Sequence, residues 1–419
     1  MLVSSNYSGA LGALGDKPNI YGKNNELLYL LDRGYIEHLG KQYKDSIDTF
    51  KEAQQKSDDL YTKSVSKIAA TWIINDYSAP YHGEDFEHVL INIFQAINYA
   101  LNGNYEDALV EARDVDSKLN VINSQYDDDD KKNVYKEDAF ARLLMGIFYE
   151  CSGTNEDLND AFISYRNSAK IYENDYTQNY GGKVPRVLKE NLLTTARFMG
   201  LAEFGKYKLK YRGVESSNLD DKKTKGEIYL IQYVGLSPVK VEESLTVPLP
   251  DGAMVKVAFP KYQQRPYGIT SSRLLAAHTD GNVFFSDSDL VENIGAIAVK
   301  NLESRKLRFM AKSALRAAGR YMVEKKQEKN VKEKFGDMTA GCFRFLANIY
   351  NIVAEQADLR CWQTLPDQIR MARLILSPGE YELSVESFGI SGDNLGAYSL
   401  GKIPVRAGEK KFFILHTPR

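Results

Sequence analysis

The chain has 419 residues, of which 43% are hydrophobic and 26% charged, and its net charge is −2 at pH 7. This composition is normal for a globular protein of two or three domains, and the small net charge provides no overall field that favours nucleic acid or an anionic membrane. Three cysteines without a CxxC spacing and five scattered histidines without an HExxH pair argue against a disulfide framework and against a metal centre.

Residues 1–25 are expected to form a flexible leader, because Ser, Gly and Asn are frequent in this segment. The segment lacks the basic and apolar regions of a signal peptide, and the chain contains no run of about eighteen apolar residues that could span a membrane. Two alternatives stay open: a cytosolic protein, and a chain that begins after a signal that has been removed.

Residues 26–211 are predicted to form pairs of amphipathic helices joined by short turns. In the first pair, Gly34 is small at the point where the second helix should press close. Gly103 provides the turn of a second pair, whereas in a third pair Gly146 is the small residue and Gly153 makes the turn. The pattern resembles the tetratricopeptide repeat, in which small residues let two antiparallel helices approach each other.

The copies are irregularly spaced, and an extra helix and a loop are expected at about residues 62–84. A plain helical bundle is the alternative to a repeat array. A stacked array leaves one face open as a groove that can hold a protein or peptide. Polar and aromatic residues beside the apolar stripes are the candidates for partner contacts: Asn92, Gln95, Tyr99, Arg142 and Tyr149. Each can instead pack between helices, which is the favoured interpretation for the two tyrosines.

Residues 212–227 are polar and predicted to be a linker, after which the hydrophobic period changes from helical to alternating. Residues 228–419 are predicted to form an α+β domain with a β-sandwich-like sheet. Its first and last strands share one sheet, and helices at 288–328 and 338–356 are inserted between them. The patterns together predict an α+β protein, in which an N-terminal all-α tetratricopeptide-like helical array precedes a C-terminal antiparallel-sheet domain with inserted helices.

Two turns of the C-terminal domain are predicted to be hairpin turns. The first is Asp280-Gly281, a dipeptide that favours tight hairpins, and the second is Ser377-Pro378-Gly379, which separates two runs of alternating residues.

Two further stretches of this half are candidates for binding. Residues 305–334 carry eleven Lys or Arg against three Glu, and a basic amphipathic helix can lie on anionic lipid or nucleic acid, although more often it is the solvated face of an ordinary helix. Arg360 and Trp362 stand beside a proline turn and are candidates for an exposed partner-binding anchor. The favoured alternative is that Trp362 fills the sheet while Arg360 pairs with Asp358.

The sequence contains no recognisable catalytic constellation. GxSxG, P-loop and HExxH motifs are absent, and no GxGxxG opens a helix after a strand. Cys361 has no neighbouring base that would activate it. We therefore expect a protein that is not an enzyme and that has no catalytic residues, no cofactor and no metal.

The layout resembles a family of bacterial exported lipoproteins with tetratricopeptide-like helices and a β-rich C-terminal domain. The resemblance spans roughly residues 27–386 and includes "DRGYIEHLGKQYKDSIDTFKEA", "GLSPVKVEE" and "RCWQTLP", of which the last two are the more specific. The family has no established activity, and its genes tend to lie near those of lipoprotein activators of penicillin-binding proteins. The resemblance implies a periplasmic protein of cell-envelope assembly, tethered to a membrane by a lipid on a cysteine that this chain lacks.

The first functional hypothesis is a non-catalytic scaffold of the bacterial cell envelope that binds a protein partner through the groove of its helical repeats. No nucleic acid is expected as a partner under this hypothesis. The alternative is a surface-binding module that uses the basic helix 305–334 to dock on anionic lipid, glycan or nucleic acid.

Overall fold

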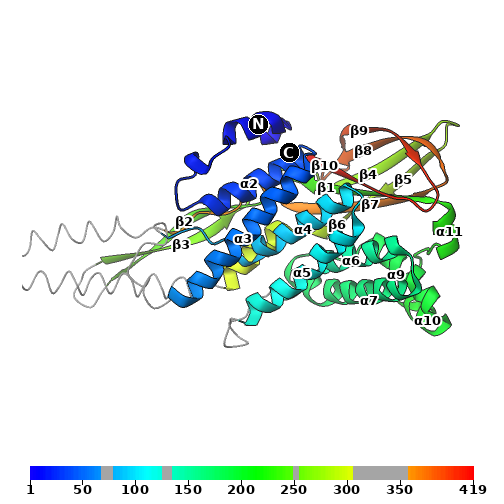
Figure 1. The fold of residues 1–419 in the computed structure, drawn as a ribbon, viewed down its shortest axis with the longest axis horizontal. Coiled ribbons are helices and arrows are strands. Elements are labelled where there is room, and N and C mark those ends of the chain that lie inside the picture. Colours follow the sequence, from blue (N-terminus) through cyan, green and yellow to red (C-terminus); the bar gives the residue numbers. More distant parts are fainter. Residues whose placement is uncertain (68–78, 125–134, 249–253, 305–356) are drawn as a thin grey trace, which may run out of the picture.

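The computed structural model describes residues 1–67, 79–124, 135–248, 254–304 and 357–419 (Figure 1). In these ranges the protein is α+β, with helices in the N-terminal half and sheets in the C-terminal half. The helices of the array are α2 (Glu26–Leu39), α3 (Tyr43–Lys67), α4 (Asp85–Leu101), α5 (Tyr105–Ser124), α6 (Ala139–Ser152), α7 (Asn155–Ile171), α9 (Arg186–Met199) and α10 (Leu201–Lys210). No helix of the described ranges combines the length and the apolar composition that crossing a membrane requires.

The array is built from helices that pack on their neighbours in chain order, from α2 to α10. Close approach within the pairs depends on glycine, as predicted. A Cβ atom on Gly34 would lie 2.9 Å from the Phe50 ring, and one on Gly146 would lie 2.3 Å from the Tyr165 ring. Such distances are too short for a side chain, so these positions allow α2 to contact α3, and α6 to contact α7, along their backbones.

The β-rich half contains two four-stranded sheets and a separate two-stranded ribbon (Figure 1). The inner sheet has the strand order β10-β1-β7-β6 and the outer sheet the order β5-β4-β8-β9. The strands are β1 (Gly226–Val234), β2 (Val239–Pro248), β3 (Met254–Gln263), β4 (Ser271–His278), β5 (Val283–Asp287), β6 (Asp289–Glu292), β7 (Gln368–Leu376), β8 (Gly379–Phe388), β9 (Asn394–Val405) and β10 (Lys410–Thr417). The ribbon of β2 and β3 projects away from both sheets.

The inner sheet is the middle layer of the molecule, with the array on one side and the outer sheet on the other. All nine residues of β1 are buried, and they alternate between the two cores. Tyr229 and Tyr233 pack with the helices, whereas Ile228 and Leu230 pack against the outer sheet. A strand that is buried on both faces favours apolar or aromatic residues, and six of the nine positions of β1 hold them.

The inner sheet also covers one face of the helical array. Nearly all residues of α2 and α4 are buried, whereas α5 buries only one stripe. The core that contains the first helix of each pair also contains Tyr229, Tyr233 and Phe412 from the sheet. The face that these first helices form is therefore occupied by the protein's own sheet and does not provide an open groove.

Two predictions about the strands need correction. The inner sheet is mixed and not purely antiparallel, because β10 pairs with β1 in parallel, although first and last strands do share a sheet as predicted. The chain does not form a hairpin at Ser377-Pro378-Gly379. It crosses there from the inner to the outer sheet, so β7 and β8 lie in different sheets. Leu374 and Leu383 both lie in the core between the sheets, and alternation alone cannot distinguish this arrangement from a hairpin.

The hairpin at Asp280-Gly281 is confirmed, since it joins the paired strands β4 and β5. The inserted helix predicted for 288–328 differs at its start, because residues 289–292 form β6 and the helix begins at residue 294. The remainder of that helix, the helix predicted for 338–356 and the basic stretch 305–334 lie outside the described residues.

Both segments that were expected to be irregular contain structure. Residues 1–25 include η1 (Leu2–Ser4), α1 (Tyr7–Leu14) and η2 (Pro18–Ile20). The Tyr7 hydroxyl lies 3.1 Å from Nδ1 of His416, so this segment packs on the body of the protein instead of forming a free leader. The expected linker 212–227 contains α11 (Leu219–Thr224) and places Lys222 in the interior.

Candidate functional site

A cleft with a volume of about 820 Å³ lies where the ends of the helix pairs meet the β-rich half. One wall comes from the turns of two successive helix pairs, around Gly103 and Gly153, and the opposite wall from α11 and the start of β10. The lining residues with charged, aromatic or large apolar side chains are Tyr105, Glu150, Leu158, Arg197, Phe198, Leu219, Asp220, Lys222, Lys223, Glu409 and Lys410.

Backbone geometry brings these elements together. Gly103, Gly153 and Gly408 have φ angles of 76°, 68° and 71°, which are left-handed conformations that favour glycine. The first two end α4 and α6 so that both turns open on the same side, and the third starts β10 beside α11. The Tyr105 hydroxyl donates to the carbonyl oxygen of Lys410 at 2.7 Å, which fixes the turn of one helix pair to the sheet.

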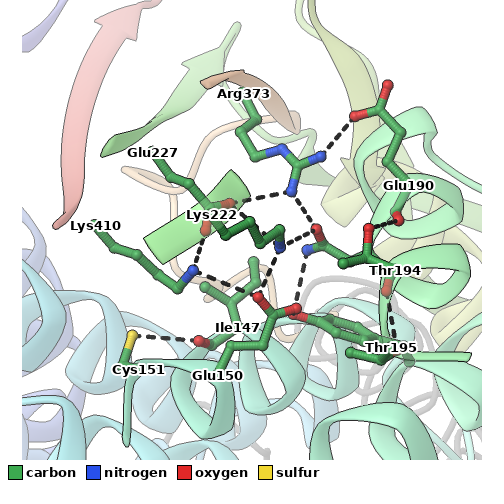
Figure 2. Close-up of polar contacts among 12 residues, drawn as sticks. Ile147, Glu150, Cys151, Glu190, Thr194, Thr195, Lys222, Glu227, Arg373 and Lys410 are labelled. Atoms are coloured by element: carbon green, nitrogen blue, oxygen red, sulfur yellow. Dashed lines mark hydrogen bonds and ion pairs between the residues drawn. The ribbon is translucent and has the colours of Figure 1, made fainter. Parts of the chain in front are cut away.

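A cluster of five buried charged residues adjoins the cleft, and we call it the charge cluster (Figure 2): Glu150, Lys222, Glu227, Arg373 and Lys410. Three of them, Glu150, Lys222 and Lys410, line the cleft and form its floor. The five residues come from α6, α11, β1, β7 and β10, so the cluster joins the array to the inner sheet. None of these side chains is more than 9% exposed.

Within the charge cluster, each carboxylate faces more than one cation. Lys222 Nζ lies 2.7 Å from a Glu150 oxygen and 3.5 Å from a Glu227 oxygen. Lys410 Nζ lies 3.4 Å from Glu150 and forms a second, closer ion pair with Glu227. Arg373 donates to Glu227 at 3.1 Å. Buried charges require such partners, because burying an unpaired charge would greatly destabilise the folded state.

Hydroxyl and carboxylate groups around the cluster complete its hydrogen bonding. Tyr165 donates to the second oxygen of Glu150 at 2.7 Å, and Arg373 donates to Glu190 at 2.7 Å. The cluster itself holds three cations and two carboxylates, and Glu190, which also pairs with Arg186 at 2.7 Å, provides a third carboxylate beside Arg373.

The pKa values follow from this arrangement. Burial would raise the pKa of Glu150 and Glu227, but the ammonium groups of Lys222 and Lys410 outweigh it and lower both below the ordinary value. Burial raises the pKa of the Cys151 thiol to about 12. The carboxylates are ionised at neutral pH and the thiol is protonated, so neither is poised to exchange a proton or attack a substrate there.

A second hollow of about 630 Å³ continues from the cleft and shares Gly103, Tyr105 and Cys151 with it. Its walls include Phe148 and Tyr149, so Tyr149, a predicted partner-contacting residue, lines this hollow. Its ring is packed beneath the Arg113 guanidinium, which lies 4.9 Å from the ring centroid, and its side chain is largely buried.

The other predicted groove residues have partners within the array. Asn92 donates to Glu111 at 2.7 Å and Gln95 donates to Gln54 at 3.1 Å, and both are fully buried between α3, α4 and α5. Tyr99 is half-buried, with the Lys51 ammonium 5.9 Å from its ring. Arg142 is half-buried and pairs with Asp116 at 2.9 Å. These contacts hold neighbouring helices together.

The predicted anchor at Arg360 and Trp362 is not exposed. Trp362 is 1% exposed and its ring packs against Tyr35, Phe50 and Phe94 of the array. Arg360 pairs with Asp358 at 2.6 Å, as the alternative interpretation predicted. The tryptophan side chain therefore joins the C-terminal half to the helices and is not accessible for contact with a partner protein.

The residues of the charge cluster were not identified from the sequence. They lie on five elements far apart in the chain, and only the fold brings them together. One local signal was present. Glu227 and Arg373 occupy strand positions on the same faces as Tyr229 and Met371, where the alternating pattern calls for apolar residues. Inward-facing charges on buried strands indicate partners elsewhere in the fold.

Within the described ranges, no group of three or more His, Cys, Asp or Glu side chains is arranged to hold a metal ion. Comparison with protein-family models, with curated proteins and with solved structures finds no match to this chain.

Proposed function

We propose that this protein is a non-catalytic interaction scaffold that holds a segment of a protein partner in the cleft. The observation that carries the proposal is the cleft of about 820 Å³ with its adjoining hollow, at the point where two helix-pair turns, α11 and β10 converge. The face made by α2, α4 and α6 is covered by the inner sheet. The partner site is therefore displaced from the side of the array to the ends of its hairpins.

The lining of the cleft suits a peptide segment. Leu158, Phe198 and Leu219 supply apolar wall, and Arg197, Asp220 and Glu409 supply charges of both signs near the opening. Interfaces commonly combine an apolar centre with a polar rim. The charge cluster beneath is held by multiple ion pairs, which gives the cleft a fixed floor and lowers the ordering cost of binding.

The chemistry of the floor supports binding over catalysis. The carboxylates are ionised and paired with cations, and the neighbouring thiol is protonated. We further propose, from the sequence resemblance alone, that the protein acts in the bacterial cell envelope with its N-terminal side tethered to a membrane by a lipid. A tetratricopeptide-like character of the array belongs to the same proposal and is supported by the close approaches at Gly34 and Gly146.

The test is capture of partners from an envelope extract with three forms of the chain: the wild type, Phe198→Lys and Val121→Lys. Phe198 lines the cleft and is 40% exposed, whereas Val121 is 55% exposed on α5 and is absent from the cleft lining. The proposal predicts a protein that the wild type and Val121→Lys retain and that Phe198→Lys loses at least tenfold.

Equal retention by both variants would place the partner elsewhere and refute the cleft as its site. A photo-crosslinking residue at position 219 checks the same point directly. It should label the captured partner, whereas the same residue at position 121 should not.

A further inference from the structure

A second buried polar group lies between the array and the inner sheet, away from the cleft. It consists of Asp138, the N-cap residue of α6, and Glu292, the last residue of β6, which we call the acid pair. Asp138 is 0% exposed and Glu292 is 1% exposed. Both side chains come from elements that the sequence separates widely, so the pair forms only when the array and the sheet are docked.

The contacts of the acid pair are hydrogen bonds from hydroxyl and backbone N–H groups. Asp138 accepts from the N–H of Ala141 at 2.7 Å and from the Tyr135 hydroxyl. The Tyr176 hydroxyl lies 3.2 and 3.1 Å from the two oxygens of Glu292, and it accepts from the N–H of Ala139 at 3.3 Å. Tyr176 thus bridges the first turn of α6 and the end of β6.

Tyr176 belongs to the single π-helical turn η5 (Tyr172–Tyr176), which itself holds the sheet. Tyr172 donates to the carbonyl oxygen of Val291 at 2.6 Å, and Asn293 donates to the carbonyl oxygen of Tyr180 at 2.8 Å. π-helical turns are rare and are often found at functional sites. The Tyr180 hydroxyl is buried in this region, and among the described residues it has no hydrogen-bond partner.

Within the described ranges, no cation balances the acid pair. Across the described part of the chain, neither carboxyl forms an ion pair with Lys, Arg or His. Among the described residues, the titratable groups around the pair are four tyrosines (135, 172, 176 and 180) and the carboxylates of Asp116 on α5, Asp175 on η5 and Asp289 on β6. Asp116 is itself paired with Arg142 at 2.9 Å. Two ionised carboxylates at this place would repel each other in a medium of low dielectric constant.

We propose that the acid pair is a pH-sensitive latch between the helical array and the inner sheet, closed while Glu292 carries a proton and released when it becomes ionised. Asp138 is the member that keeps a negative charge, because it caps the N-terminus of α6. Release separates β6 from η5 and from the first turn of α6. The latch is distinct from the cleft and does not depend on the proposed partner.

The direction of the pH effect follows from the pKa values. Burial first, and then the charge of Asp138, raise the pKa of Glu292 well above its ordinary value. Burial raises the pKa of Asp138 to about 6. A carboxyl whose pKa is raised in the folded state stabilises that state fully below its unfolded pKa. The contribution is lost as the pH rises toward the folded pKa.

The test is hydrogen exchange of the full chain between pH 5 and pH 9, followed at residues 172–176 and 289–292 and corrected for intrinsic exchange. In the wild type, the equilibrium constant for opening at these residues should increase by up to about tenfold per pH unit, which is the dependence expected for one titrating group. Glu292→Gln keeps the shape of the side chain and removes its titration, so above the pKa of Asp138 its opening should be nearly independent of pH. Equal pH dependence in both proteins would overturn the latch.

Two further variants keep the result interpretable. Glu87→Gln removes another fully buried carboxyl, at the N-terminus of α4, whose pKa is raised to about 7. It should leave exchange at 172–176 as pH-dependent as in the wild type. Tyr176→Phe retains both carboxyls and removes the bridging hydroxyl. If Glu292→Gln does not fold, Tyr176→Phe should still open more than the wild type at every pH, and an unchanged opening would contradict the latch.

Discussion

The array and the inner sheet are joined by two buried groups of carboxylates that solve the same problem in different ways. In the charge cluster, Glu150 and Glu227 face Lys222, Lys410 and Arg373. In the acid pair, Asp138 and Glu292 face tyrosine hydroxyls. A buried carboxyl group can thus be stabilised either by a neighbouring cation or by remaining protonated. In the first case its contact weakens in acid, and in the second case it weakens in base.

The largest expected effect is the loss of one carboxylate from the charge cluster. Glu227→Gln leaves two ammonium groups and a guanidinium with too few counter-charges in the interior, and it should lower the free energy of unfolding by about 3–5 kcal/mol. Urea unfolding at pH 7 measures it. The matched variant is Glu190→Gln, because the Glu190 side chain also pairs with Arg373 but is 18% exposed. This variant should lower the free energy of unfolding by only about 1 kcal/mol. Equal losses would mean that burial does not set the cost.

The pH dependence of the two groups is the next contrast. The pKa values of Glu150 and Glu227 are lowered by Lys222 and Lys410, so their stabilisation is present above the unfolded value and is lost as the pH falls. Below pH 4.5, the free energy of unfolding should decrease by roughly 1.4 kcal/mol per pH unit for each group. The double variant Glu227→Gln/Lys410→Met should titrate less steeply in acid, as measured by urea unfolding between pH 3 and pH 6.

A change in the helix that carries both groups should disturb them without altering a charge. Gly146 lies in α6, between Asp138 and Glu150, and a Cβ atom there would meet the Tyr165 ring at 2.3 Å. Gly146→Ala should therefore cost about 1–3 kcal/mol through overpacking. Gly205→Ala is the control, because a Cβ atom at this helical position in α10 has open space. Gly205→Ala should stabilise the protein by about 0.5–1 kcal/mol. In thermal unfolding, the midpoint temperature should therefore fall for Gly146→Ala and rise for Gly205→Ala.

The smallest effect is expected at a third, neutral contact between the same layers. His38 is fully buried, with Nδ1 2.6 Å from Asn98 and Nε2 2.8 Å from the Tyr233 hydroxyl. Burial lowers the pKa of His38 to about 4, so the ring is uncharged at neutral pH. Tyr233→Phe leaves Nε2 without its donor and should cost about 1 kcal/mol in urea unfolding at pH 7. A loss as large as that of Glu227→Gln would show that charge is not what distinguishes the cluster.

The local features of the fold could be predicted from the sequence, because they depend on spacing. Gly34 and Gly146 were recognised as points of close helix approach, and the strands at the two ends of the C-terminal half were expected to share a sheet. The crossing at Ser377-Pro378 was predicted as a hairpin, since the same turn residues and the same alternation fit both arrangements. That the sheet covers the array depends on contacts between distant segments, which no local pattern contains.

The site was less predictable than the fold. Asn92, Gln95, Arg142 and Tyr149 were chosen because they are polar or aromatic beside an apolar stripe, and these properties equally suit contacts between helices. The charge cluster draws Lys222 from a segment that was expected to be a linker and Lys410 from the last strand. Its members have no common spacing in the sequence, and their ion pairs become visible only when the distances between them are known.

The parallel pairing of β1 with β10 has a consequence for how the protein is made. Glu227 is paired with Lys410, so the inner sheet can be completed only after the ribosome has added residues 410–417. Until then, the face made by α2, α4 and α6 lacks Phe412 and the rest of the cover that β10 provides, and that part of its apolar surface is exposed on the nascent chain. Exposed apolar surface on an incomplete chain invites aggregation. Newly made copies should therefore depend on chaperones more than their helical content suggests, and truncation before β10 should convert a stable protein into a chaperone client.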